Sequence, residues 1–268
     1  MRAFARGASC AFACAFALAL VLLAASGVAR ADATVGSPSA RAGDRCAALG
    51  ADHPTPSATA SAAPSGRKSG NGLARRELTE DERTRVAALD AAIAGPDEAA
   101  RGAARYRRAR IFYEANQWAE AARGFCDALE RPHPTELSLY AAELLLDCLN
   151  ALGWYDELER AAERYRAWPE LAKDRSFVEI CDRIRAGLWR MHAERLDHEE
   201  RFAESAALYL RIADRFKSDP RLDEILYNAA VSFDRAGDAA AAAAARKRLI
   251  KIKPDSPLAK KAAAQLSR

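Results

Sequence analysis

The sequence contains few of the residues that most often carry out catalysis, and it lacks common motifs that arrange them. Its 268 residues include only four histidines. No Gly-x-Ser-x-Gly sequence is present to hold a nucleophilic serine on a tight turn, and no glycine-rich loop is present to bind a phosphate. We therefore predict a protein that is not an enzyme, has no catalytic residue and needs no cofactor.

Histidine and cysteine are not spaced as metal ligands. His53 and His133 stand beside prolines, and His192 and His198 lie six residues apart, on different faces of an expected helix. No Cys-x-x-Cys pair occurs. We predict no metal site.

The chain also lacks a strongly charged segment. Its formal net charge is +4, and no run of lysine and arginine alternates with aromatic residues, which make up 7% of the chain. A nucleic-acid-binding surface normally needs such a basic patch. We expect neither a nucleic acid nor a small-molecule substrate as a partner.

The first 33 residues have the order of a secretory signal peptide. The apolar stretch 11–25 follows two arginines and precedes small-residue cleavage sites that end at Ala31 and Ala33. The alternative is an uncleaved leader, because residues 11–29 are almost long enough to span a bilayer. That leader would be the chain's only attachment to a membrane.

Residues 34–76 are rich in Ala, Ser, Pro and Gly and have almost no large apolar side chain. Such a composition cannot form a core, so we predict a disordered linker between the leader and a folded domain at residues 77–268.

Four cysteines remain once the leader is removed, namely Cys46, Cys126, Cys148 and Cys181. An exported protein meets an oxidising environment that permits disulfides. Four cysteines allow three pairings, and the sequence does not choose among them.

The folded part repeats one helix-turn-helix pattern four times. An apolar helix, a turn residue and a second apolar helix recur around Asn116, Gly153, Glu200 and Gly237. One such pair cannot bury its apolar face alone, so the copies are expected to stack into a solenoid.

The interval between the turns is not constant. Successive turn residues are separated by 37, 47 and 37 residues. The longer middle interval indicates an insertion, which we expect to form an extended helix. Its apolar residues at helical spacing are Phe177, Ile180, Ile184 and Leu188.

Capping signals mark both ends of the predicted domain. Thr79 and Glu82 form a capping box, and Ser256 followed by Pro257 opens a short terminal helix that would cap the solenoid. Aromatic residues follow three of the turns, and we expect all three to pack between helices. They are Trp118, Tyr155 and Phe202; Trp154, beside Tyr155, is not assigned to the core.

The copies resemble the tetratricopeptide repeat over about residues 103–268. The fourth copy matches the family pattern through Ala230, Phe233, Gly237, Ala242, Leu249 and Pro254. The first matches through Ala109, Phe112, Trp118, Ala121, Phe125 and Ala128, with Asn116, which tolerates the left-handed conformation, in place of the usual glycine. The second has Leu158, and the third Glu200 and Ser205, where the family prefers small residues. The resemblance implies an all-α solenoid of about four helical hairpins with a C-terminal capping helix.

A leader, a Pro/Ser/Ala-rich linker and degenerate repeats together are similar to bacterial envelope tetratricopeptide proteins. That group includes BamD-like, Tol-Pal-associated and gliding-motility proteins. The chain has no lipoprotein cysteine after the leader, which BamD-like proteins carry. The similarity implies a periplasmic location.

In this family the first helix of each pair lines a concave groove that binds protein segments. The corresponding residues here are Tyr106, Arg110, Tyr113, Glu143, Asp147, Asn150, Arg190, Glu194, Asp197, Tyr227 and Asp234. They suggest an acidic groove with aromatic anchors for a peptide with basic and apolar side chains. The other interpretation is that these residues form a solvated helix face. We favour it for any single residue, and we favour the groove for the set as a whole.

These observations predict an exported periplasmic adaptor that binds another envelope protein through the groove. The alternative is an accessory or self-assembling structural subunit of a cell-wall or motility complex. The sequence does not identify the partner.

Overall fold

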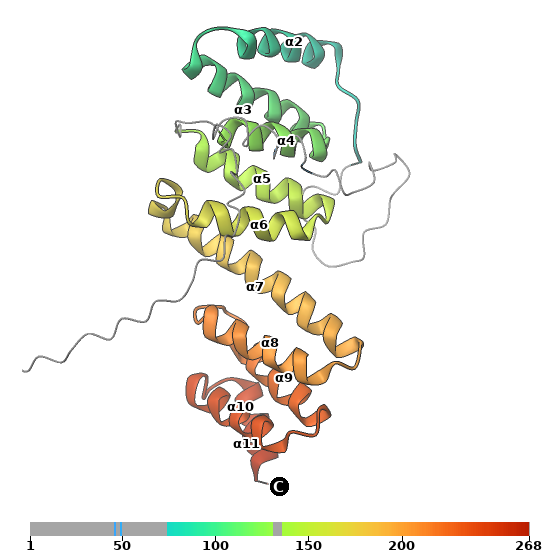
Figure 1. Cartoon of the computed structure of the whole chain (residues 1–268), viewed down its shortest axis with the longest axis vertical. Coiled ribbons are helices and arrows are strands. Elements are labelled where there is room, and N and C mark those ends of the chain that lie inside the picture. Colours follow the sequence, from blue (N-terminus) through green and yellow to red (C-terminus); the bar gives the residue numbers. More distant parts are fainter. Residues whose placement is uncertain (1–45, 47–48, 50–73, 131–135, 268) are drawn as a thin grey trace, which may run out of the picture. The chain divides into compact units, whose positions relative to one another are not determined.

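The computed structural model describes Cys46, Leu49 and residues 74–130 and 136–267, and this part of the chain is helical (Figure 1). It has ten α-helices, a short 3-10 turn and, within those residues, no strand. The prediction of an all-α fold is confirmed. The predicted leader and most of the predicted linker lie outside the described residues.

Consecutive helices pack side by side along the chain (Figure 1). Their bounds are α2 (Glu80–Ala94), α3 (Glu98–Glu114), α4 (Trp118–Leu129), α5 (Ser138–Leu152), α6 (Tyr155–Arg166), α7 (Arg175–His198), α8 (Phe202–Arg215), α9 (Leu222–Arg235), α10 (Ala239–Ile252) and α11 (Pro257–Leu266). The 3-10 turn η1 (Leu171–Lys173) precedes α7.

Four helix pairs are closed by the same turn. The pairs are α3–α4, α5–α6, α7–α8 and α9–α10, and the four predicted turn residues have φ of 56° (Asn116), 70° (Gly153), 60° (Glu200) and 80° (Gly237). In each turn the next residue donates its backbone N–H to the carbonyl five positions earlier, as Gln117 does to Phe112 at 2.9 Å. This is the Schellman arrangement, which satisfies carbonyls at the end of the first helix. The four copies therefore share one backbone geometry although only two turns contain glycine.

The position five residues after each turn is buried in all four copies. Ala121, Leu158, Ser205 and Ala242 are at most 1% exposed. The two departures from alanine are accommodated differently. Leu158 adds apolar volume to the core, whereas the Ser205 hydroxyl, 0% exposed, donates to the carbonyl of Ala193 at 2.9 Å and so avoids an unpaired buried donor.

Helix α7 belongs to both hydrophobic cores of the chain. The first core is built by α3 to α6 and the first half of α7, which contributes Phe177 and Cys181. The second is built by α8 to α11 and by α7 from its midpoint onward, which contributes Ala186 and Ala193. The predicted extended helix is confirmed, and its 24 residues link the two cores.

One aromatic prediction is wrong. Tyr155 is 42% exposed, whereas its neighbour Trp154 is 5% exposed and belongs to the first core. Trp154 lies directly after the left-handed Gly153 and is the N-cap residue of α6; at this turn the residue after the left-handed position, not the one two residues on, enters the core. Trp118 and Phe202 are half-buried, as expected.

Cys46 and Cys126 form a disulfide that attaches a residue of the predicted linker to α4. Cys46 is 4% exposed and lies in the first core, and Arg123 of α4 donates to the carbonyl of Leu49 at 3.3 Å. Cys148 and Cys181 are free and buried. Burial raises the pKa of both thiols, that of Cys181 to about 12, so both are poor nucleophiles in the folded state.

The disulfide predicts a redox-dependent stability. Because the cross-link spans 80 residues, it restricts the unfolded chain, and Cys46→Ser should lower the free energy of unfolding by about 2–4 kcal/mol. Thermal unfolding followed by circular dichroism measures the effect. A reducing agent should destabilise the wild-type protein and leave the variant unchanged, and equal stability of the wild type in both conditions would refute the disulfide.

The turns predict opposite effects for two substitutions. Glu200 adopts a left-handed conformation that is strained for a side chain with a Cβ, so Glu200→Gly should stabilise the protein by up to about 1 kcal/mol. Gly237→Ala should destabilise it by about 1 kcal/mol, through backbone conformation alone, since an added Cβ would have no atom within 4 Å. Urea unfolding of both variants checks the signs. Two effects of the same sign would contradict the shared turn geometry.

Candidate binding surface

The eleven predicted groove residues are carried by the first helix of each pair. Three lie on α3, three on α5, three on α7 and two on α9. None is fully buried: Arg110, Asn150, Glu194 and Asp234 are exposed, and the other seven are half-buried. Most of them, however, contact neighbouring helices or segments of the fold. These residues have a structural role, and only the others are available to a partner.

Tyr113 and Asp147 connect the first two pairs. The Tyr113 hydroxyl of α3 donates to Oδ2 of Asp147 on α5 at 2.6 Å, and its ring makes an edge contact with Trp118 at a centroid distance of 5.1 Å. Burial, and then the hydrogen bond to Asp147, raises the pKa of Tyr113. These two residues hold α3 against α5, so their first role is structural.

The groove residues of α7 and α9 are engaged in the same way. Asp197 accepts a hydrogen bond from Ser232 at 3.0 Å and pairs with Arg235, which joins α7 to α9. Asp234 pairs with Arg246 of α10. These carboxylates neutralise arginines within the fold.

Two further members contact the elements that follow their own helices. Nη1 of Arg190 lies 3.6 Å from Oδ1 of Asp219, in the segment before α9. Lys261 of α11 stands 4.9 Å from the centre of the Tyr227 ring, a cation–π contact that fastens the last helix to α9.

Three members make no hydrogen bond or ion pair with any described side chain. Asn150 and Glu194 are exposed, and Glu143 is half-buried. Partial burial, and then the charge of Asp174, raises the pKa of Glu143. These polar groups of α5 and α7 are therefore open to an outside partner.

The remaining two members, Tyr106 and Arg110, line a hollow of about 540 Å³ between α2 and α3. Its lining residues are Arg85, Ala88 and Leu89 from α2, and Tyr106, Arg107, Arg110, Ile111 and Glu114 from α3. The size is within the range of ligand-binding pockets, about 300–1,000 Å³. Sequence reasoning missed the contribution of α2, because the repeat pattern begins only at α3.

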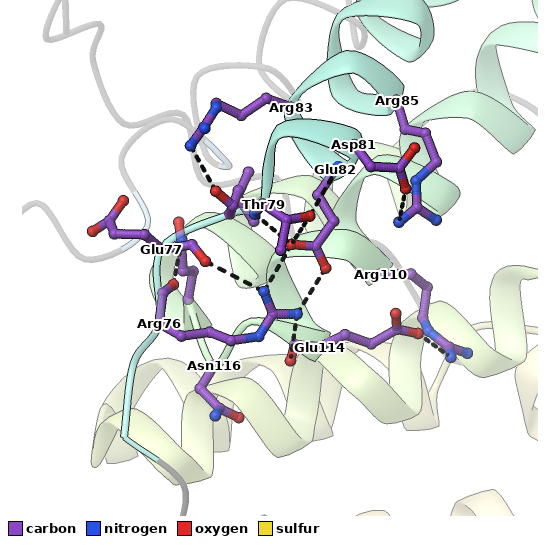
Figure 2. A network of polar contacts seen from close by, with 12 residues as sticks. Arg76, Glu77, Thr79, Asp81, Glu82, Arg83, Arg85, Arg110, Glu114 and Asn116 are labelled. Carbon is purple, nitrogen blue, oxygen red and sulfur yellow. Dashed lines mark hydrogen bonds and ion pairs between the residues drawn. The ribbon is translucent and has the colours of Figure 1, made fainter.

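A polar network holds the start of α2 beside the C-terminal end of α3, which carries the lining residue Glu114. Figure 2 shows the Arg76 guanidinium between Glu82 and the backbone of Glu114; it donates to both oxygens of Glu82 at 2.7 Å and to the Glu114 carbonyl at 3.4 Å. The predicted capping box of Thr79 and Glu82 is confirmed. Arg76 was assigned to the linker, yet its own backbone N–H donates to the carbonyl of Ala115 at 3.0 Å.

Side chains of the α3–α4 turn also bind the backbone of residues 74–76, just before α2. Asn116 donates to the carbonyl of Ala74 at 3.1 Å, and Gln117 donates to the carbonyl of Arg76 at 2.9 Å. Asparagine at the first turn therefore has a use that glycine would lack. The adjacent arginines and the capping box were the available sequence signal for this contact.

The described residues include neither a candidate metal site nor a candidate membrane-spanning helix. Within residues 74–130 and 136–267 and the two described positions before them, no three His, Cys, Asp or Glu side chains are grouped to hold a metal ion. No helix in that same part of the chain is long and apolar enough to cross a membrane.

Comparison with protein-family models and with curated proteins finds no match to this chain.

The Arg76–Glu82 pair predicts a loss of stability in acid. Hydrogen bonds from Arg76, and then from Thr79, lower the pKa of Glu82 from 4.5 to about 2. Above pH 4.5 the ionised Glu82 carboxylate contributes fully to the free energy of unfolding. Between pH 4.5 and 2 the carboxylate is protonated in the unfolded state before it is protonated in the folded state, so this stabilisation is lost as the pH falls. Glu82→Gln should therefore be less stable than the wild type at neutral pH, and the difference should shrink as the pH falls.

Urea unfolding at a series of pH values measures this. Glu77→Gln, at an exposed neighbouring glutamate, is the matched control and should follow the wild type throughout. If the free energy of unfolding of Glu82→Gln stays below that of the wild type by a constant amount from neutral pH to pH 2, the ion pair is contradicted.

Proposed function

We propose that this protein is an exported adaptor that holds another envelope protein on the surface formed by the first helices of its four pairs. The observation that carries the proposal is the open hollow between α2 and α3, which contains two of the predicted groove residues, Tyr106 and Arg110. A preformed apolar concavity with polar residues at its edge is the usual form of a binding site.

The four identical turns support a repeat scaffold of the tetratricopeptide type. They join the two helices of each pair with the same backbone geometry. We propose that the pairs stack so that α3, α5, α7 and α9 present equivalent faces. Scaffolds built from stacked helix pairs offer extended surfaces for protein segments. Exposed polar residues, such as Asn150 on α5 and Glu194 on α7, extend the candidate surface beyond the hollow.

The disulfide supports export. Structural disulfides persist in oxidising compartments such as the periplasm and are rare in the cytosol. The Cys46–Cys126 bond lies in the first core, where it would contribute to folding only after oxidation. Together with the signal-like leader, it favours a periplasmic location.

Cross-linking in intact cells, followed by purification of the tagged protein, tests the adaptor function. The wild-type protein should enrich one or a few envelope proteins. The double variant Asn150→Lys and Glu194→Lys should recover at least about tenfold less of them, because it reverses the charge of the available surface without breaking a described hydrogen bond.

Glu170→Lys, an exposed substitution of similar charge outside α5 and α7, is the matched control and should capture the partner normally. Capture that is equal in the double variant would exclude the α5 and α7 part of the surface and leave the hollow between α2 and α3 as the candidate. Recovery of the protein alone would replace the adaptor by the self-assembling subunit.

A further inference from the structure

We infer that the hollow between α2 and α3 receives an acidic peptide segment that carries at least one large apolar side chain. The inference rests on the proposed adaptor function and specifies the chemistry of its partner at this end of the surface. It differs from the basic peptide that the acidic residues of α5 and α7 would favour.

The floor of the hollow is apolar and accessible. Ala88 and Leu89 line one side, and Tyr106 and Ile111 line the other. Ala88 is exposed and Leu89 and Tyr106 are half-buried, whereas Ile111 is buried beneath them at 8% exposed. The Tyr106 ring is fixed against Phe125 at a centroid distance of 5.8 Å. An apolar side chain of a partner would remove this surface from water, and the hydrophobic effect would favour that burial.

The rim of the hollow is basic. Three arginines and one glutamate are among its lining residues, so the lining carries a net charge of +2. Arg107 is exposed, and no described residue forms an ion pair with it. The planar guanidinium group binds carboxylates through two parallel hydrogen bonds, which makes an acidic side chain the complementary partner.

The other two arginines are oriented but not fully engaged. Arg85 lies 3.1 Å from Asp81, and Arg110 donates to Glu114 at 2.7 Å; their side chains remain 57% and 45% exposed (Figure 2). Each is thus held at the rim by one carboxylate and retains guanidinium N–H groups that face solvent. A second carboxylate, from a peptide, would complete their hydrogen bonding.

The hollow is preformed. The Arg76–Glu82 pair and the backbone contact from Arg76 to Ala115 hold the start of α2 against the α3–α4 turn. A site that is already ordered loses less conformational entropy when a partner binds. The same contacts keep Arg85 of α2 opposite Arg107 and Arg110 of α3.

Direct binding of two labelled peptides to the purified protein tests the inference. The probes are Glu-Glu-Leu-Phe-Glu-Glu and Lys-Lys-Leu-Phe-Lys-Lys, with blocked ends and a fluorescent label, followed by anisotropy. The acidic probe should bind at least about tenfold more tightly than the basic one, and its affinity should fall as salt is added.

Two variants address the rim and the floor separately. Arg107→Glu should weaken the acidic probe about tenfold, whereas Arg183→Glu, at an exposed arginine of α7, should not. Ala88→Phe should abolish binding by filling the hollow, whereas Ala87→Phe, the same change at an exposed neighbour outside the lining, should not. Circular dichroism verifies that all four variants fold.

Equal affinity for the two peptides, or unchanged binding of the acidic peptide to both Arg107→Glu and Ala88→Phe, would overturn the inference. The outcome is separable from that of the proposed function. If the protein captures an envelope partner in cells while the acidic peptide fails to bind, the adaptor function stands and the assignment of this hollow falls.

Discussion

The left-handed turn between paired helices is the constraint on which the rest of the structure depends. In all four pairs one residue with positive φ reverses the chain, and the next N–H binds the carbonyl five positions earlier. The turn therefore sets the direction of the second helix and leaves a small or closely packed position five residues on. Asn116 and Glu200 adopt the conformation without being glycine, which indicates that packing of the two helices outweighs the local cost of a left-handed residue with a Cβ.

Helix α7 carries this arrangement across the insertion. Its first half packs into the core of α3 to α6, and its second half packs into the core of α8 to α11. Because one continuous helix packs into both cores, consecutive helices remain in contact across the longer repeat interval. Buried polar groups near its C-terminal end are satisfied across helices: Ser205 binds a carbonyl of α7, and Ser232 of α9 binds Asp197.

Two separate attachments involve described residues that precede α2. Arg76 binds Glu82 in the first turn of α2 and the carbonyl of Glu114 at the end of α3, and Cys46 is joined to Cys126 of α4 by the disulfide. Helix α2 also contacts α3 through half-buried apolar residues and through the ion pair of Asp90 with Arg108 at 2.6 Å, and Glu82 is its only buried side chain. Polar contacts at both ends of α2 thus hold one wall of the hollow in place.

Local signals determined a large part of this structure. Helical periodicity, the four turn residues, the capping box at Thr79 and the Ser256–Pro257 start of the last helix all act within a few residues, so the sequence alone predicted them and also the extended helix in the middle interval. Tertiary structure decided what depends on distant partners. Trp154 rather than Tyr155 enters the core, Cys46 selects Cys126 among three thiols, and Asp147 binds Tyr113 instead of remaining free. The hollow also required α2, whose own pattern is too weakly apolar to reveal its place. The Arg76 side chain, just before α2, reaches the Glu114 carbonyl 38 positions later only in the folded chain.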